Sequence, residues 1–180
     1  MKARSFLICV GIMLLFSMVA CKSSDNSVIN AEETYPECAG ELAIIYSDLT
    51  EIIADAQSIV KVSVEKQSVV DLDGYPQTHT AVTVQNCYKG NLKTGSSIEV
   101  IEEGGIDGKV MGGIPQLSKE NEYFLFLTEY NGSYYICGAF QGRFIIKDDC
   151  VYQQATKDVK LANYKPLSTE EFSKSLSPKQ

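Results

Sequence analysis

Residues 123–127 have the sequence Tyr123-Phe124-Leu125-Phe126-Leu127, and this run of aromatic and aliphatic side chains decides the fold. Successive side chains of a strand point to opposite faces, so a strand that is apolar at every position is covered on both faces. Asn131-Gly132 follows it, and Asn-Gly between two strand-like runs is the strongest short-range signal for a β-hairpin. The run therefore predicts the central strand of a sheet, with a return strand over residues 134–139.

Strands of a second kind, apolar on alternate residues, precede this central run. Valines alternate with polar residues over 60–65 and over 82–85, and the same period of two appears over 98–100. The turn sequence Asp-Leu-Asp-Gly at residues 71–74 lies between the first two runs and indicates a hairpin connection.

A further hairpin is expected after the central strand, pairing residues 143–147 with residues 150–153 across Asp148-Asp149. Six or seven short strands with turn signals at close intervals are typical of small all-β domains. The sequence thus predicts a mainly β fold, a small antiparallel OB-like barrel or sandwich.

Two helices are expected to flank the strands. Residues 41–55 carry an apolar stripe at helical spacing, which predicts an N-terminal amphipathic helix packed against the sheet. At the other end, Ser168 and Glu171 have the spacing of a capping box, which predicts a short helix through Leu176. The stripe consists of Leu42, Ile45, Tyr46, Leu49, Ile52, Ile53 and Ala56.

The N-terminal segment has the arrangement of an export signal. Lys2 and Arg4 give it a positive start, and residues 6–20 are apolar except for Ser17. The apolar run is shorter than the about 20 residues that a membrane-spanning helix needs. It ends in Ser-Met-Val-Ala-Cys at residues 17–21, which resembles the bacterial lipobox, with methionine in place of the commoner leucine.

In the lipobox family the cysteine sulfur receives a diacylglycerol before a peptidase cuts ahead of it. The resemblance implies that residues 1–20 are a signal peptide and that Cys21 is lipidated. It also implies a lipid-anchored protein on the extracytoplasmic face of the bacterial cell membrane or outer membrane. In some bacteria with two membranes, an aspartate after the lipidated cysteine retains lipoproteins in the inner membrane. Lys22 is at that position here, so the sequence allows location in the outer membrane.

The length of the chain after residue 20 predicts a single domain that follows the lipidated cysteine. Residues 21–36 are polar and predict a flexible tether, residues 37–155 form the expected β-barrel domain, and residues 156–180 form a tail with the short helix. Removing residues 1–20 removes two bases and no acids, which leaves 14 bases against 23 acids and a net charge of −9. This charge repels phosphate backbones, so we expect no nucleic-acid partner. We also expect acyl chains, rather than a basic patch, to attach the protein to the membrane.

Four cysteines remain once Cys9 leaves with the signal and Cys21 is lipidated, namely Cys38, Cys87, Cys137 and Cys150. An oxidising compartment allows three pairings, and the short separation in sequence favours a disulfide between Cys137 and Cys150. Buried cysteines without any bond are the alternative. Their spacing contains no Cys-x-x-Cys and the chain has one histidine, so we expect no metal and no cofactor.

A glycine-rich stretch is the candidate binding loop, with Gly104, Gly105, Asp107, Gly112 and Gly113 as its residues. A phosphate-binding loop would need a helix and a Lys-Ser or Lys-Thr after it, and neither follows. An irregular connection between strands is the alternative to a loop that recognises a partner.

Catalytic constellations are not recognisable in the sequence. His79 is the single histidine, in a polar stretch that predicts the exposed start of a strand, and no nucleophile elbow occurs. Glu102-Glu103 and Asp148-Asp149 are adjacent pairs whose side chains would diverge on a strand, so solvated turn residues are expected. We therefore do not expect an enzyme.

Residues 54–130 are similar to netrin-like and tissue-inhibitor-of-metalloproteinase domains, through Ala54-Asp55-Ala56, the strands at 59–64 and 82–84, Tyr88-Lys89-Gly90 and the central run. That resemblance implies an OB-like barrel. The inhibitors act through a free N-terminal cysteine in a Cys-x-Cys start, whereas Lys22-Ser23 follow Cys21. The leading hypothesis is a non-catalytic binding module with an envelope protein as its partner; the alternatives are an extracytoplasmic hydrolase of unrecognised type and a netrin-like protease inhibitor.

Overall fold

The structure, a computed structural model, describes residues 37–38, 44–105, 110–111 and 113–176. The predicted signal peptide, Cys21 and the tether lie outside the described residues, as do Asp107 and Gly112. Ten strands and two helices are described, in the order β1 (Glu37–Cys38), α1 (Leu49–Asp55), β2 (Ser58–Leu72), β3 (Tyr75–Lys89), β4 (Ser97–Glu103), β5 (Val110–Met111), β6 (Glu122–Tyr130), β7 (Ser133–Ile136), β8 (Arg143–Lys147), β9 (Cys150–Gln153), β10 (Leu167–Ser168) and α2 (Thr169–Leu176).

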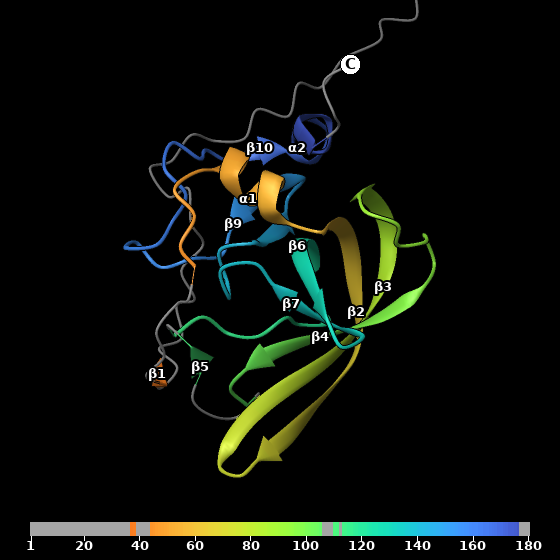
Figure 1. Cartoon of the computed structure of the whole chain (residues 1–180). Helices are drawn as coiled ribbons and strands as arrows, with labels where there is room; N and C mark the ends of the chain where they lie inside the picture. Colours follow the sequence, from red (N-terminus) through yellow and green to blue (C-terminus); the bar gives the residue numbers. More distant parts are fainter. Residues whose placement is uncertain (1–36, 39–43, 106–109, 112, 177–180) are drawn as a thin grey trace, which may run out of the picture.

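Eight of the strands form one mixed sheet in the order β10-β9-β8-β6-β2-β3-β4-β7 (Figure 1). Strand β7 also pairs with β6, so β6, β2, β3, β4 and β7 are linked in a ring of pairings. Only Val100 with Tyr134 and Ile101 with Tyr135 join β4 to β7, and they do so in parallel. The prediction of a mainly β fold is confirmed, as a mixed sheet that is not a clear closed barrel.

Three two-residue turns connect neighbouring antiparallel strands where the sequence predicts them. Both residues of each turn have positive φ, as in type I′ hairpins, and Asn, Asp and Gly adopt this conformation most readily. The turns are Asp73-Gly74 (φ 54° and 88°), Asn131-Gly132 (φ 52° and 83°) and Asp148-Asp149 (φ 49° and 59°).

Strand β6 is buried on both faces, as predicted from its unbroken apolar run. Phe124 and Phe126 pack into one apolar cluster, with Phe144 of β8 and Phe172 of α2. The intervening residues of β6 pack into a second cluster, together with the valines of β2 and β3. The two helices cover the first cluster near β6 and β9 (Figure 1).

The helix predicted over 41–55 is present over Leu49–Asp55 and is wrong for residues 44–48. Residues 44–48 are not helical, residues 41–43 lie outside the described residues, and α1 begins at Leu49. The Asp48 carboxylate accepts hydrogen bonds from the N–H groups of Thr50 and Glu51, which caps the helix at this point. The backbone of Tyr46 is bonded to the Gln141 side chain through both its N–H and its carbonyl, so it is held outside the helix.

The C-terminal helix is confirmed together with its cap. The Ser168 hydroxyl accepts from the Glu171 N–H at 3.3 Å, and the Glu171 carboxylate accepts from the Ser168 N–H at 3.1 Å. Each side chain thus satisfies a backbone donor of the other, which is the reciprocal pattern of a capping box. Phe172 and Leu176 then lie on the buried face of α2.

Candidate functional site

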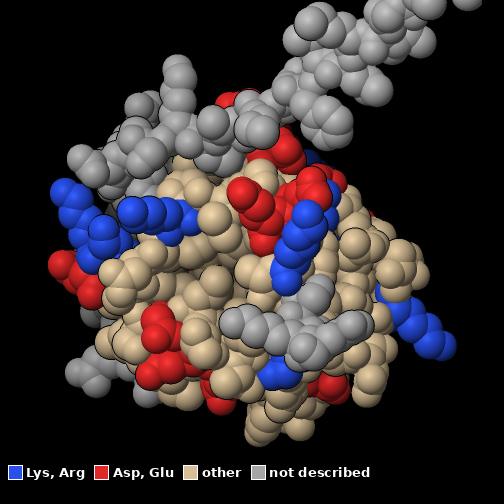
Figure 2. All heavy atoms as spheres, turned by 90° about the horizontal axis from the view of Figure 1, so that it is seen from above, with Lys and Arg blue, Asp and Glu red and all other residues tan. Residues whose placement is uncertain are grey.

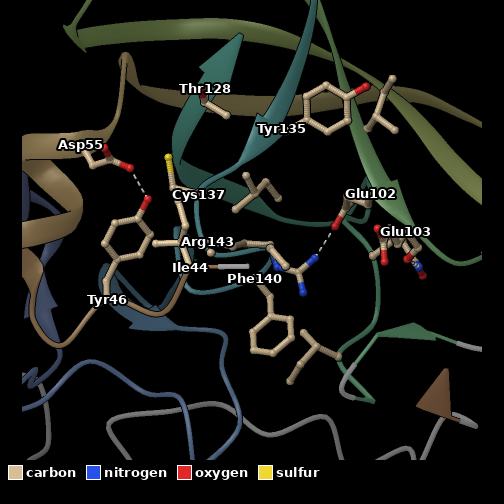
Figure 3. A pocket seen from close by; sticks show the side chains of 16 residues that line it. Ile44, Tyr46, Asp55, Glu102, Glu103, Thr128, Tyr135, Cys137, Phe140 and Arg143 are labelled. Atoms are coloured by element: carbon tan, nitrogen blue, oxygen red, sulfur yellow. Dashed lines mark hydrogen bonds and ion pairs between the residues drawn. The ribbon is translucent and has the colours of Figure 1, made fainter. Parts of the chain in front are cut away.

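A pocket of about 340 Å³ opens where the segment before α1 meets β4, β7 and the start of β8 (Figure 3). Its size falls within the range of small-molecule sites. The side chains that line it include Ile44, Tyr46, Asp55, Ile101, Glu102, Glu103, Ile114, Gln116, Thr128, Tyr135, Ile136, Cys137, Phe140 and Arg143.

A buried ion pair forms one part of the wall. Arg143 is the first residue of β8, and its Nη1 donates to Glu102 Oε1 at 2.5 Å. The Leu117 N–H donates to the other carboxylate oxygen of Glu102 at 3.1 Å. Burial raises the pKa of Glu102, whereas the Arg143 guanidinium and the Leu117 N–H favour the charged carboxylate. Both side chains are thereby fixed in position by the bonds that compensate their desolvation.

Tyr46, Asp55 and Cys137 form the opposite part of the wall (Figure 3). The Tyr46 hydroxyl donates to the Asp55 carboxylate at the end of α1. Burial raises the pKa of Tyr46 well above its ordinary value, and the bond to Asp55 adds to the shift. Burial, followed by the negative charge of Asp55, raises the pKa of Cys137 to about 11. The thiol is therefore protonated at neutral pH and is a poor nucleophile.

Apolar side chains line the pocket between these two polar parts of its wall. Ile101 comes from β4, Ile114 from the segment after the glycine-rich stretch, and Ile136 from β7. Phe140 adds an aromatic ring, and Ile44 stands at the mouth with about half of its surface exposed. The pocket therefore suits a ligand with an apolar body and polar groups that meet the walls.

Of the predicted binding loop, the described glycines Gly104, Gly105 and Gly113 are not among the residues that line this pocket. Gly104 and Gly105 are buried against the β2–β3 hairpin, where the Gly104 N–H donates to the Pro76 carbonyl at 2.8 Å. Gly113 is half-buried and precedes Ile114, which does line the pocket. The pocket is therefore lined by residues that precede the loop, such as Glu103, and by residues that follow it, such as Ile114.

The predicted disulfide between Cys137 and Cys150 is wrong. Cys137 is a free buried cysteine, and Cys150 is disulfide-bonded to a residue outside the described side chains. Cys137 lies at the Arg143 end of β8, because its carbonyl accepts from the Gly142 N–H, whereas Cys150 pairs with Lys147 at the other end. The length of β8 separates the two by about 13 Å, beyond the roughly 7 Å that a disulfide allows between α-carbons.

Cys87 is the second free cysteine among the described side chains, and it is half-buried. It belongs to β3, and its thiol donates to the Lys89 carbonyl. Cys21 and the side chain of Cys38 lie outside the described residues.

The structure also differs from the expectations for Glu102 and His79. Glu102 was expected as a solvated turn residue, but it belongs to β4 and is buried because Arg143 pairs with it. His79 was expected at the exposed start of a strand, but it lies within β3 with Nδ1 3.2 Å from a carboxylate oxygen of Glu99, and it does not line the pocket.

Sequence reasoning missed Arg143 and Tyr46 as pocket residues. An arginine that opens the apolar strand Arg-Phe-Ile-Ile at 143–146 was an available signal, because a buried guanidinium needs a carboxylate partner. The Arg143 Nε is itself buried without a hydrogen-bond partner among the described residues. Tyr46 left no such signal, since its spacing fitted a helix.

No family model and no curated protein matches this chain. Within the described part of the chain, no group of three or more His, Cys, Asp or Glu side chains is placed to hold a metal ion. None of the helices in that part is long and apolar enough to cross a membrane.

Proposed function

We propose that the protein is a lipid-anchored, non-catalytic binding module on the extracytoplasmic face of a bacterial membrane, and that its ligand or envelope partner binds at the pocket between β4, β7 and residues 44–46. The lipobox-like sequence ending at Cys21 supports the anchor. On the face shown in Figure 2, acidic side chains are interspersed among the basic ones. This distribution supports acyl chains rather than a basic patch as the means of attachment.

The pocket wall is the observation that carries the binding proposal. Arg143 and Glu102 bind each other, the Tyr46 hydroxyl binds Asp55, and burial keeps the Cys137 thiol protonated. An enzyme that uses a nucleophile needs a side chain that a nearby base can deprotonate. Here the charged groups are paired with each other and the thiol stays protonated. Fixed polar groups around an apolar space are typical of recognition sites.

We also infer that the ring of five strands is an OB-like barrel, which is a five-stranded and partly open architecture. The pairing of β7 with both β4 and β6 supports this inference. It agrees with the similarity of residues 54–130 to netrin-like domains. A netrin-like protease inhibitor would need a free amine on Cys21, so an intact mass that includes acyl chains on the mature protein would exclude that alternative.

Two neighbouring isoleucines provide a matched test of the pocket. Ile44 lines it and Ile45 does not, while their exposed fractions are similar, 54% and 60%. We would compare wild type, Ile44→Arg and Ile45→Arg as lipidated bait proteins in pull-downs from solubilised envelopes. We expect Ile44→Arg to lose a partner that wild type and Ile45→Arg retain. Equal capture of every partner by the two variants would contradict binding at the pocket, and turnover of a substrate would favour a hydrolase.

A further inference from the structure

The tip of the β2–β3 hairpin exposes a group of large apolar side chains. Strand β2 pairs with β6 only from Ser58 to Ser63 and with β3 through Leu72, and β3 pairs with β4 only from Gln77 onwards. The hairpin therefore projects from the body of the molecule (Figure 1). Tyr75 is 77% exposed at its end, the largest value among the exposed apolar residues of the described chain.

Three of these side chains share one face of the hairpin. Leu72 and Tyr75 are directly opposed across the turn, and Val70 lies two residues before Leu72 on the same strand face. All three are exposed, and none of them belongs to an apolar cluster of the described residues. Exposed apolar groups of this kind usually mark a surface that meets a partner or a membrane.

The end of the molecule that carries the tip is also the end at which the chain enters the domain. Gly104 is bonded to Pro76 of the hairpin, and β5 follows it by six residues. Strand β5 pairs with β1, which begins at Glu37 directly after the predicted tether. In Figure 1, β1, β5 and the tip all lie below the body of the sheet, away from α2. As a coil, residues 22–36 would span about 20 Å between Cys21 and this end.

We propose that the tip of the β2–β3 hairpin rests on the lipid bilayer that holds the acylated Cys21, an inference that depends on the proposed lipid anchor. Tyr75, Leu72 and Val70 then form a second, shallow contact beside the acyl chains. A tyrosine ring suits this level of the bilayer because its body is apolar and its hydroxyl is wetted. The contact also fixes the orientation of the domain, with α2 farthest from the membrane.

The acidic residues of the tip limit its depth. Asp71 accepts from the Gly74 N–H at 2.6 Å, which closes the turn, and Asp73 is exposed beside it. Two carboxylates oppose entry into the acyl region. The apolar side chains therefore stay at the boundary between the headgroups and the acyl chains. Zwitterionic lipid is preferred over anionic lipid because the carboxylates are repelled by negative headgroups.

Tryptophan fluorescence tests the contact, because the chain contains no tryptophan of its own. Tyr75→Trp places a single reporter at the tip. Lys174→Trp is the control, since that side chain is 72% exposed on α2 at the opposite end. Each mature, lipidated variant is incorporated into phosphatidylcholine vesicles that contain lipids with brominated acyl chains, which quench tryptophan on contact.

We expect bromolipid to quench the emission of the Tyr75→Trp protein and to leave that of the Lys174→Trp protein unchanged. Replacing part of the phosphatidylcholine with phosphatidylglycerol should reduce the quenching. Equal quenching of the two proteins, or none in either, would overturn the proposal and would leave the exposed tip to a protein partner. Flotation of the same samples separates the two proposals, because protein that fails to float with vesicles contradicts the lipid anchor itself.

Discussion

Arg143 Nη1 lies 2.5 Å from Glu102 Oε1, and this ion pair joins β8 to β4, two strands that are not neighbours in the sheet. Both side chains are more than nine-tenths buried. The pair therefore forms a fixed polar part of the pocket wall. It also links the part of the wall that β4 contributes to the part that β8 contributes.

Removing one partner of this pair should be strongly destabilising. Glu102→Gln leaves the Arg143 guanidinium buried without its counter-charge, which typically costs about 3 to 5 kcal/mol in the free energy of unfolding. The double variant Glu102→Leu/Arg143→Met, in which no charge remains, should recover most of that loss. Urea unfolding of the three proteins measures the difference. A loss below about 1 kcal/mol in Glu102→Gln would mean that the pair is solvated.

The central strand should dominate stability. Phe126 is fully buried, and its ring centroid lies 5.2 Å from that of Phe144. Phe126→Ala should lower the free energy of unfolding by about 3 to 5 kcal/mol. Val70→Ala at the exposed hairpin tip is the control, with an expected effect within about 0.5 kcal/mol. Similar losses in both variants would place Phe126 outside the core.

Thiol mapping should distinguish the four cysteines that follow Cys21 in the sequence. Cys87 and Cys137 are free and Cys150 is disulfide-bonded. Alkylation of the denatured, unreduced protein should therefore label Cys87 and Cys137, while Cys150 should react only after reduction. Peptide mass mapping identifies the labelled sites. A labelled Cys150 before reduction would contradict this assignment.

Stability should fall in alkaline solution through Cys137. Its pKa is raised from 9.0 to about 11 by burial, so the folded protein holds this proton more tightly than the unfolded chain. Below pH 9 both states are protonated and the free energy of unfolding is unaffected; as the pH rises from 9 towards 11, the unfolded chain releases the proton first and stability is lost. Two pKa units correspond to about 3 kcal/mol.

Comparison with Cys137→Ala isolates this effect. The variant lacks the thiol, so its free energy of unfolding should decline less between about pH 8 and pH 10.5 than that of wild type. Burial and the bond to Asp55, the two largest causes of the raised pKa of Tyr46, act in the same direction and are present in both proteins. Parallel declines in wild type and variant would show that Cys137 titrates normally.

The strands and turns could be predicted because short stretches of sequence determine their conformation. Asn131-Gly132 and Asp148-Asp149 take the left-handed conformation that their turns require, and residues 123–127 are apolar throughout and buried on both faces. The capping box at Ser168 defined the start of α2 in the same way.

Long-range contacts decided the features that the sequence did not reveal. Tyr46 fits a helical stripe, but the Gln141 side chain, 95 residues away, binds its backbone groups and keeps it outside α1. Glu102 became buried through Arg143, which is 41 residues away. Cys137 and Cys150 are near in sequence, but β8 holds them apart. Periodicity and spacing contain no information about such partners.

The proposed attachment to the membrane depends on lipidation of Cys21. The measurement is fractionation of cells that express wild type or Cys21→Ala, followed by an alkaline wash of the membranes and immunodetection of the protein. The apolar run of residues 6–20 is too short to hold the chain well by itself. We therefore expect wild type to stay with the membranes and Cys21→Ala to be released or to accumulate as unprocessed precursor. Full retention of a processed Cys21→Ala protein after the wash would contradict the lipid anchor.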